Sequence, residues 1–238
     1  MSTRRHHILI SDTLQAQMSP EPISSRQQLL RLLAERSFRL GEFKLSSGST
    51  SDYYIDCRTT TLHAEGARLT GRIFLDLIRE KRWNPAAIGG MTLGADPIVT
   101  AVALLTSQQV QTRAPARPKP VDTAGFYIHG FIVRKMEKEH GTGQRIEGFR
   151  SPGARVVIVD DVCTTGSSTI QALEAAREFG FQIVGVACLV EREEAGGRRQ
   201  VQEAAQGAEF ISIFTASQVR EEHLRIRQSE PAEVNTQQ

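Results

Sequence analysis

The stretch RVVIVDDVCTTGSS, residues 155–168, decides the fold class of this chain. Four apolar residues lead into two adjacent carboxylates, Asp160 and Asp161, and a turn of hydroxylated residues and glycine follows. A short apolar run without alternation is typical of a β-strand that is covered on both faces. In sheets built from such strands, ligands bind beyond the carboxyl ends of the strands. We therefore predict that Asp160 and Asp161 lie at a binding site.

Apolar runs and helical patterns alternate along the chain on both sides of this stretch. The spacing of apolar residues predicts helices over residues 25–36, 64–82, 95–105 and 169–179. Two short strands are predicted around a Ser/Gly turn within residues 42–58, and further strands at 86–90, 126–135, 155–161, 182–191 and 208–214. Strands separated by long helices require crossover connections and a parallel sheet. The predicted fold class is α/β, doubly wound, with a central, mostly parallel sheet flanked by helices.

The composition narrows the class of protein but not its chemistry. The 238 residues carry a formal net charge of +2, with 39% hydrophobic and 24% charged residues, as in a globular domain. So small a net charge gives no global field to attract nucleic acid or a membrane surface. The three cysteines (Cys57, Cys163 and Cys188) form no C-x-x-C pair, and no apolar segment resembles a signal peptide or a membrane span. We expect a cytoplasmic protein that binds neither nucleic acid nor membranes.

Polar segments flank the patterned region. Residues 1–22 are predicted to form a polar N-terminal extension, residues 23–215 the main domain, and residues 216–238 a polar C-terminal tail that begins with a short helix. The segment 111–125 contains three prolines and is predicted to be a loop within the domain. We therefore predict one domain with two polar ends.

The turn after the two acids, residues 164–168, has the features of a phosphate site. A helix N-terminus exposes backbone N–H groups and a partial positive charge, and Gly166 lets the backbone approach a ligand closely. Carboxylates beside a phosphate suit neutral hydroxyls, or a cation that lies between them and a polyphosphate. A ribose with a 5′-phosphate meets both conditions. The alternative is that the hydroxyls cap a helix and Asp160 caps a turn, which leaves the second acid unexplained.

The segment VVIVDDVCTTGSS resembles the 5-phosphoribosyl-1-diphosphate (PRPP) signature of the type I phosphoribosyltransferases. The chain has no P-loop motif and no complete dinucleotide fingerprint. The resemblance implies that Asp160 and Asp161 bind the ribose hydroxyls. It implies that the residues after them bind the 5′-phosphate, namely Val162, Cys163, Thr164, Thr165, Gly166, Ser167 and Ser168. The fold it implies is the type I phosphoribosyltransferase fold, with a small hood and a flexible catalytic loop.

The segment FIVRKMEKEHGTG, residues 131–143, concentrates cations beside two glycines. A run of mixed charges is more often a solvated surface loop. However, the segment is similar to the catalytic loop of the orotate phosphoribosyltransferase family, which implies that it closes over the site and neutralises a departing pyrophosphate. The residues implied are Arg134, Lys135, Lys138 and His140 for PRPP binding, and Lys135, Lys138, His140 and Asp161 for catalysis. In that family the loop commonly reaches the neighbouring subunit, so a homodimer that shares the loop 134–143 is implied.

The segment GEFKLSSGSTSDYYIDCR, residues 41–58, resembles the part of that family that holds the flat base. The resemblance implies that Tyr54, or else Tyr53, stacks on orotate, while Ser47 and Gly48 supply backbone contacts. The alternative is a plain β-hairpin with Tyr53 and Ile55 in the core.

The segment LVEREEAGG, residues 189–197, places Arg192 directly after a predicted strand. A guanidinium can pair bidentately with a carboxylate, and the family pattern implies this role toward the carboxylate of orotate. Thr164 is implied as a second contact to orotate. The alternative for Arg192 is a surface cluster of mixed charges.

The segment IGGMTLGADPIVTA, residues 88–101, resembles the family's pyrophosphate loop but departs from it. Leu93 and Gly94 stand where some members have Tyr-Lys, and Ser46 stands where some have lysine. Fewer cations then face the pyrophosphate, so more charge must come from the loop 134–143 or from a metal. The resemblance implies Mg²⁺ that is carried mainly by PRPP, near Asp161, and no metal site made by the protein alone.

These resemblances cover residues 25–214 and imply transfer of the phosphoribosyl group from PRPP to orotate. Three alternatives remain open. One is a type I phosphoribosyltransferase for purines or uracil, against which Arg192 and the cationic loop argue. The others are a non-catalytic regulator that keeps the fold, and an inactive paralogue, suggested by Ser46 and the proline-bearing segment 111–125.

Overall fold

A six-stranded sheet forms the centre of the computed structural model, which describes residues 23–44, 50–113, 127–135 and 145–229. Its strands are β3 (Ala87–Met91), β4 (His129–Val133), β5 (Ile146–Gly148), β6 (Arg155–Cys163), β7 (Gln182–Glu191) and β8 (Phe210–Thr215). They lie in the order β5-β4-β3-β6-β7-β8, and all neighbours are parallel except β5, which is antiparallel to β4. The predicted α/β class with a mostly parallel sheet is therefore confirmed.

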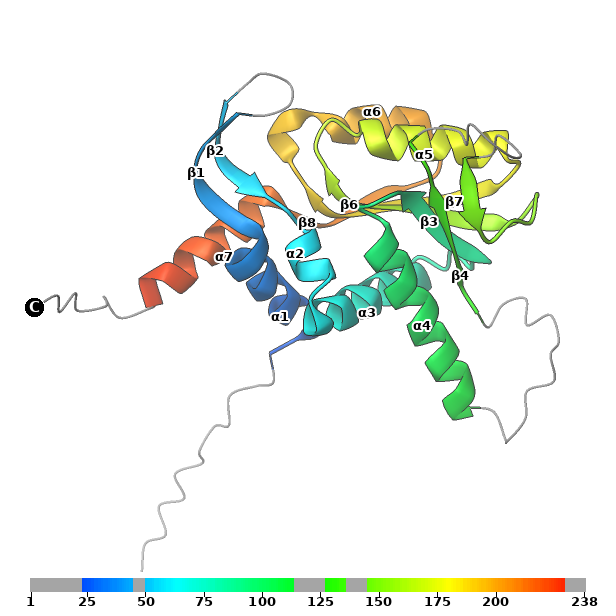
Figure 1. The fold of residues 1–238 in the computed structure, drawn as a ribbon, viewed down its shortest axis with the longest axis horizontal. Coiled ribbons are helices and arrows are strands. Elements are labelled where there is room, and N and C mark those ends of the chain that lie inside the picture. Colours follow the sequence, from blue (N-terminus) through cyan, green and yellow to red (C-terminus); the bar gives the residue numbers. More distant parts are fainter. Residues whose placement is uncertain (1–22, 45–49, 114–126, 136–144, 230–238) are drawn as a thin grey trace, which may run out of the picture.

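Helices cover both faces of the sheet (Figure 1). One layer holds α5 (Ser167–Glu178) and α6 (Gly197–Ala205), and the other holds α3 (Ala64–Glu80) and α4 (Asp96–Arg113). The helix α1 (Ser25–Leu32), which continues as a π-helical turn (Leu33–Ser37), lies beside α3, and the helix α7 (Ala216–Ser229) packs against α1 and this turn. Because both faces are covered, residues 156–160 of β6 are all buried, which is why the sequence shows a continuous apolar run there.

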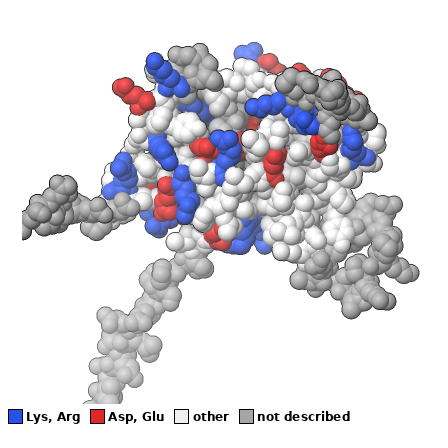
Figure 2. All heavy atoms as spheres, in the orientation of Figure 1, with Lys and Arg blue, Asp and Glu red and all other residues white. Residues whose placement is uncertain are grey.

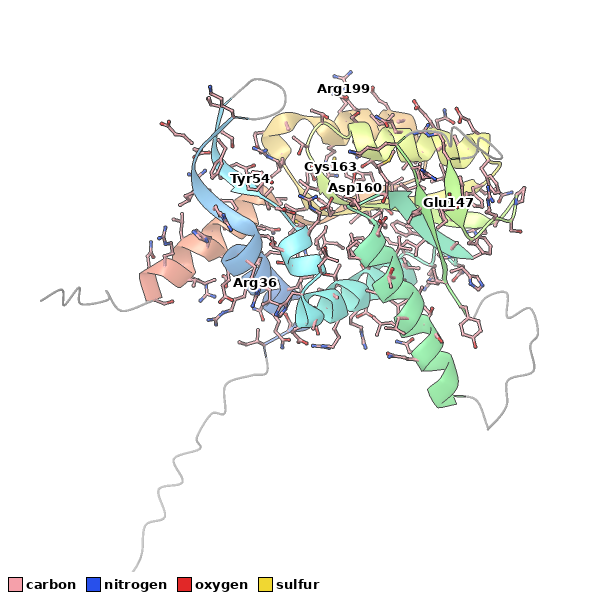
Figure 3. The ribbon with its side chains drawn as sticks, in the orientation of Figure 1. Arg36, Tyr54, Glu147, Asp160, Cys163 and Arg199 are labelled. Atoms are coloured by element: carbon pink, nitrogen blue, oxygen red, sulfur yellow. The ribbon has the colours of Figure 1, made fainter. Side chains whose placement is uncertain are left out.

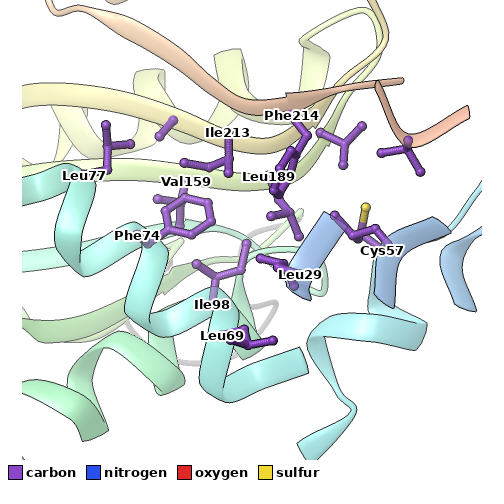
Figure 4. Close-up of a cluster of buried hydrophobic side chains, with 14 of the residues drawn as sticks. Leu29, Cys57, Leu69, Phe74, Leu77, Ile98, Val159, Leu189, Ile213 and Phe214 are labelled. Atoms are coloured by element: carbon purple, nitrogen blue, oxygen red, sulfur yellow. The ribbon is translucent and has the colours of Figure 1, made fainter. Parts of the chain in front are cut away.

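Two hydrophobic clusters fill the spaces between the sheet and its helices. The first joins side chains of α1, α3 and α4 to the sheet, among them Leu29, Phe74, Ile98, Val159 and Leu189 (Figure 4). The second lies under α5 and α6 and includes Leu173, Val201, Phe131, Ile158 and Cys163. Truncating a buried Phe to Ala typically costs about 3–5 kcal/mol, so each cluster contributes strongly to holding the strands in place.

The strand order reverses between β3 and β6. From β3 the chain adds β4 on one side, and from β6 it adds β7 and β8 on the other side. A crevice opens at such a switch point because the two connections leave in opposite directions. The carboxyl ends of β3 and β6 are therefore the expected position of the site.

A small hood stands outside this sheet. It consists of the antiparallel strands β1 (Phe38–Lys44) and β2 (Thr50–Ile55), followed by the short helix α2 (Arg58–Thr61). The hood contacts α7 through an ion pair between Arg220 and Asp52 (2.7 Å), and His223 Nδ1 lies 2.8 Å from the carbonyl oxygen of Ala34. Val219 and Ile226 of α7 are buried. The segment predicted as a polar tail thus contains a packed helix that supports the hood.

Several elements differ from the prediction. The helix predicted at 95–105 runs on to Arg113 as α4, and the strand that carries the acid pair runs on to Cys163. The elements β5 and α6 are absent from the prediction. The segment β5 has three residues, and α6 has only Val201 and Ala205 as buried side chains beyond its first residue, so neither shows a clear pattern. The domain boundaries at residues 22 and 215 remain a prediction.

Charged side chains of both signs are mixed over the surface seen in Figure 2. Helical pairs such as Arg72–Asp76 (2.7 Å) account for part of this mixing, and exposed pairs of this kind contribute about 0.3–0.5 kcal/mol each. In the described ranges, none of the helices combines the length and the apolar character that a membrane span requires.

Candidate active site

A cleft of about 330 Å³ opens at the switch point, beneath the hood. Its walls come from the hood, the β3–α4 loop, the end of β4, the end of β6, the start of α5 and the end of β7. The residues that line it are Tyr54, Ile55, Asp56, Arg58, Met91, Thr92, Leu93, Gly94, Lys135, Asp160, Asp161, Val162, Thr164, Ser168 and Arg192. Figure 3 shows Tyr54 on the hood and Asp160 on β6, on two different walls of this cleft.

The two acids lie in the second half of β6 and have different surroundings. Asp160 is 4% exposed, and its carboxylate accepts hydrogen bonds from the hydroxyl of Thr169 (2.9 Å) and the backbone N–H of Asp161 (3.0 Å). Asp161 is half-buried, and its carboxylate accepts the backbone N–H of Val162 (2.9 Å). Burial, and then the like charge of Asp161, raises the pKa of Asp160 to about 8. Burial also raises the pKa of Asp161.

The turn after the acids leads directly into α5. Gly166 precedes this helix with φ +79°, and a Cβ atom there would lie 2.5 Å from Cγ2 of Val201, so both conformation and space require glycine. Thr164 and Ser168 line the cleft, whereas Thr165 and Ser167 are exposed outside its lining. The side chain of Cys163 is fully buried in the second hydrophobic cluster, so only its backbone could contact a ligand.

Arg192 is held on several sides and is only 7% exposed. Its guanidinium carbon lies 4.4 Å from the centre of the Tyr53 ring, and its Nε donates to the Tyr53 hydroxyl (2.9 Å). Its Nη2 donates to Ser51 Oγ (3.1 Å) and lies 3.0 Å from Glu194 Oε1. The alternative of a surface charge cluster is therefore wrong for Arg192.

The two tyrosines of the hood face opposite ways, because neighbouring residues of a strand do so. Tyr53 is 7% exposed and stacks on Phe38, with ring centres 5.2 Å apart, while Ile55 is also buried. Burial, and then the hydrogen bond to Glu194, raises the pKa of Tyr53 far above its ordinary value. Tyr54 is 42% exposed and lines the cleft, so it is the tyrosine placed to meet a ligand.

The predicted loop residues are only partly within the described chain. Lys135 is exposed and lines the cleft. Arg134 is absent from the cleft lining and instead forms an ion pair with Glu147 (3.4 Å). The remaining predicted loop and turn residues lie outside the described residues, namely Lys138, His140, Ser46, Ser47 and Gly48.

Several residues of the site were missed by the sequence analysis. Thr169 holds Asp160, Ser51 and Glu194 hold Arg192, and Asp56 and Arg58 line the cleft from the hood. The pair Asp56–Arg58 has one detectable signal in the sequence. Asp56 directly follows the apolar end of a predicted strand, as Asp160 directly follows Val159. The contact between Ser51 and Arg192 joins segments that are far apart in the sequence. Thr169 and Glu194 lie near their partners in the sequence, but spacing alone does not show that they are in contact.

The described residues contain no cluster of three or more His, Cys, Asp or Glu side chains that would hold a metal ion. The carboxylates of Asp160 and Asp161 are nonetheless oxygen ligands of the kind that Mg²⁺ prefers. They fit a cation that a polyphosphate brings with it and that needs few protein ligands.

Comparison with known proteins agrees with this geometry. Residues 62–207 match the model of the phosphoribosyl transferase domain family. The chain is 40% identical over 197 residues to an orotate phosphoribosyltransferase of Aquifex aeolicus, covering 82% of this chain and 97% of that protein. It is 39% identical over 191 residues to one of Rhodopirellula baltica, covering 79% of this chain and 90% of that protein.

Solved structures of phosphoribosyltransferases are also similar to this chain. Mycobacterium tuberculosis orotate phosphoribosyltransferase in complex with PRPP has a TM-score of 0.61 at 33% identity, covering 82% of this chain and 99% of that chain. An adenine phosphoribosyltransferase of Leishmania tarentolae has a TM-score of 0.56 at 14% identity, covering 84% of this chain and 91% of that chain. At so low an identity, this similarity shows the fold alone. The fold and the acid-bearing cleft are thus those of a type I phosphoribosyltransferase. Within that class, the chain belongs to the orotate phosphoribosyltransferase family.

The raised pKa of Asp160 predicts how stability changes with pH. Because the carboxyl group takes up a proton near pH 8 when folded and near pH 3.8 when unfolded, its stabilising effect is complete below about pH 3.8 and is lost as the pH rises through 8. We expect Asp160→Asn to melt higher than the parent protein at pH 9, with a difference that shrinks toward pH 5. In a domain of this size, 1 kcal/mol corresponds to about 2–4 °C.

Thermal denaturation followed by circular dichroism between pH 5 and pH 9 measures this difference. Asp76→Asn is the matched control, because Asp76 is a half-exposed partner in a helical ion pair and surface changes stay within about 0.5 kcal/mol. Melting curves for Asp160→Asn that run parallel to those of the parent across the whole pH range would contradict the prediction.

Proposed function

We propose that this chain transfers the 5-phosphoribosyl group of PRPP to N1 of orotate, which gives orotidine 5′-monophosphate and pyrophosphate in de novo UMP biosynthesis. The observation that carries the proposal is the convergence of an acid pair, a hydroxyl turn and a fixed arginine in one cleft. The relatives named orotate phosphoribosyltransferase, and the M. tuberculosis enzyme solved with PRPP, support it.

The sugar phosphate would bind along β6 and α5. Asp161, the more exposed acid, is accessible to the ribose hydroxyls, while Thr169 holds Asp160 from behind. The turn 164–168 and the amino terminus of α5 offer N–H and O–H donors to the 5′-phosphate. As the bond to the leaving group breaks, positive charge develops on the ribose, and the two acids would stabilise this charge in their ionised form.

The leaving group carries the opposite charge. Mg²⁺ bound to the PRPP oxygens would neutralise part of the pyrophosphate, with Asp160 and Asp161 as its nearest suitable protein ligands. Lys135 is the described residue of the cationic loop that faces the cleft. The roles of Lys138 and His140 on that loop, and of Ser47 and Gly48 beside the base, rest on the family resemblance.

The base would lie between Tyr54 and Arg192. Tyr54 offers an exposed ring for stacking on a planar pyrimidine. Among the described residues, the contacts of Arg192 engage its Nε and Nη2, so Nη1 is the nitrogen left for the carboxylate of orotate. Thr164, on the same cleft wall as the acids, remains the proposed second contact to orotate. Since the guanidinium is already oriented, little entropy is lost when orotate binds.

The choice of base tests the proposed reaction. We expect the protein to consume orotate in the presence of PRPP and Mg²⁺ and to reject uracil, because Nη1 of the buried Arg192 guanidinium would be left without its partner in the ligand. Discrimination by a missing polar group reaches about 10⁴-fold. Ultraviolet absorbance follows orotate loss, with uracil, hypoxanthine and adenine assayed in parallel. A folded sample that binds PRPP but turns over a purine, or no base at all, would refute the reaction.

The contacts of Arg192 predict a selective effect on orotate. Arg192→Lys keeps the charge but loses the planar fork, so we expect the KM for orotate to rise about 10- to 100-fold while the KM for PRPP stays within about twofold. Tyr53→Phe removes one hydrogen-bond partner of Nε and keeps the ring, so a smaller rise, about threefold to tenfold, is expected.

Steady-state kinetics with each substrate varied in turn measures both effects. The control is Arg199→Lys, because Arg199 lies on the outer side of α6 with 86% of its side chain exposed (Figure 3). An equal rise in the KM values of both substrates would show that Arg192 supports the fold of the cleft rather than the binding of orotate.

We further propose a cytoplasmic homodimer in which the loop 134–143 of one subunit reaches the cleft of the other. An apolar groove of about 600 Å³ between α2, α3 and α4 supports an interface on this side. Leu62 is 72% exposed and Leu104 57% exposed on its walls, and both would gain from burial against a second subunit. The three cysteines are buried as free thiols, which is compatible with a reducing compartment.

Sharing of the loop can be tested by mixing two inactive variants. A Lys138→Ala chain keeps intact acids and an Asp161→Ala chain keeps an intact loop, so each mixed dimer regains one complete site if loops act in trans. Random exchange makes about half of the dimers mixed, so about one quarter of the parent activity should return. Sedimentation and exchange of labelled subunits confirm the mixing. Confirmed exchange without recovery would place the loop in its own subunit's site.

A further inference from the structure

Arg58 lines the catalytic cleft, yet the proposed reaction assigns it no role. It begins α2, and two residues separate it from the end of the hood strand β2. Its Nε lies 2.8 Å from Oδ1 of Asp56 and its Nη2 lies 2.9 Å from Oδ2, so the carboxylate holds one edge of the guanidinium in a bidentate pair. The backbone N–H of Arg58 donates to the same carboxylate (3.0 Å). The guanidinium is therefore oriented before any ligand arrives.

The guanidinium of Arg58 also has capacity left for an anion. A guanidinium has five N–H groups, and Asp56 engages one on Nε and one on Nη2. The side chain is 45% exposed, in contrast to the 8% of Arg192. Among the described residues of the cleft, the cations are Arg58, Lys135 and Arg192. Arg58 is the one that is both fixed by a carboxylate and open to the cleft.

On the opposite wall of the cleft, Gly94 leaves no room for a side chain beside the acids. A Cβ atom on Gly94 would lie 2.3 Å from Oδ1 of Asp161 and 3.1 Å from Oδ1 of Asp160. Any side chain at this position would displace the acids. Among protein side chains, positive charge for a ligand between the acids and the hood is therefore expected from the hood or from the cationic loop.

We propose that Arg58 binds the diphosphate group of PRPP, with Asp56 as the residue that positions it. The inference rests on the proposed function and assigns the anion by chemistry. The acids hold the ribose hydroxyls, and the 2′-hydroxyl is attached next to C1, which carries the diphosphate. Arg58 and Asp161 line the same cleft, so a diphosphate attached to C1 of a ribose held by the acids would lie in the space that Arg58 faces. The carboxylate of orotate has its own partner in Arg192.

The test measures the affinity for inorganic pyrophosphate by isothermal titration calorimetry, together with KM values for PRPP and orotate. Charge-assisted hydrogen bonds contribute about 1.5–3 kcal/mol, so Arg58→Gln should weaken pyrophosphate binding and raise the KM for PRPP about 10- to 100-fold. The KM for orotate should stay within about twofold. Arg58→Lys keeps the charge without the fork and should lie between Arg58→Gln and the parent protein.

The matched control is Arg72→Gln, because Arg72 forms a comparable ion pair with Asp76 and has 52% of its side chain exposed, on α3. This variant should bind pyrophosphate like the parent. Melting temperatures of all variants verify that the fold is retained. Parent protein that fails to turn over orotate would overturn the proposed function itself. If the parent is active, unchanged pyrophosphate affinity in Arg58→Gln, or an equal rise in both KM values, would overturn the role of Arg58 alone.

Discussion

The close packing of two carboxylates against a single glycine of the β3–α4 loop is the constraint on which the site depends. Asp160 and Asp161 lie at the β3–β6 switch point, where Gly94 packs directly against their oxygens. Thr169 and the backbone N–H of Asp161 compensate part of the cost of burying Asp160. The remaining cost appears as the raised pKa values of the pair. A polyhydroxyl ligand with its own cation relieves this repulsion, so the site is poised for such a ligand.

The hood is joined to the sheet through Arg192. This arginine leaves the end of β7 and is held by Tyr53 and Ser51 of β2, while α7 supports the hood from outside through Arg220. The base and the sugar would therefore be bound by two parts of the molecule that meet across one cleft. A substitution in the hood should alter the binding of the base more than the binding of the ribose, because the acids belong to the central sheet.

Much of the fold could be predicted because strands buried on both faces leave continuous apolar runs, as at β3, β6 and β7. The misses have physical causes. The strand β5 is three residues long, and α6 has only Val201 and Ala205 as buried side chains beyond its first residue. Short or mostly polar elements take their structure from neighbours, and neighbours in space are not visible in a local pattern.

The sequence by itself determined that the acid pair and the hydroxyl turn share one site, because they are contiguous and a strand followed by a helix needs no distant partner to bring them together. Only the tertiary structure decided which tyrosine faces the cleft, that Arg192 is buried and oriented, and that Arg58 shares the cleft with the acids. The physical reason is distance along the chain. Arg192 and Tyr53 are 139 residues apart, and such contacts follow from packing rather than from spacing.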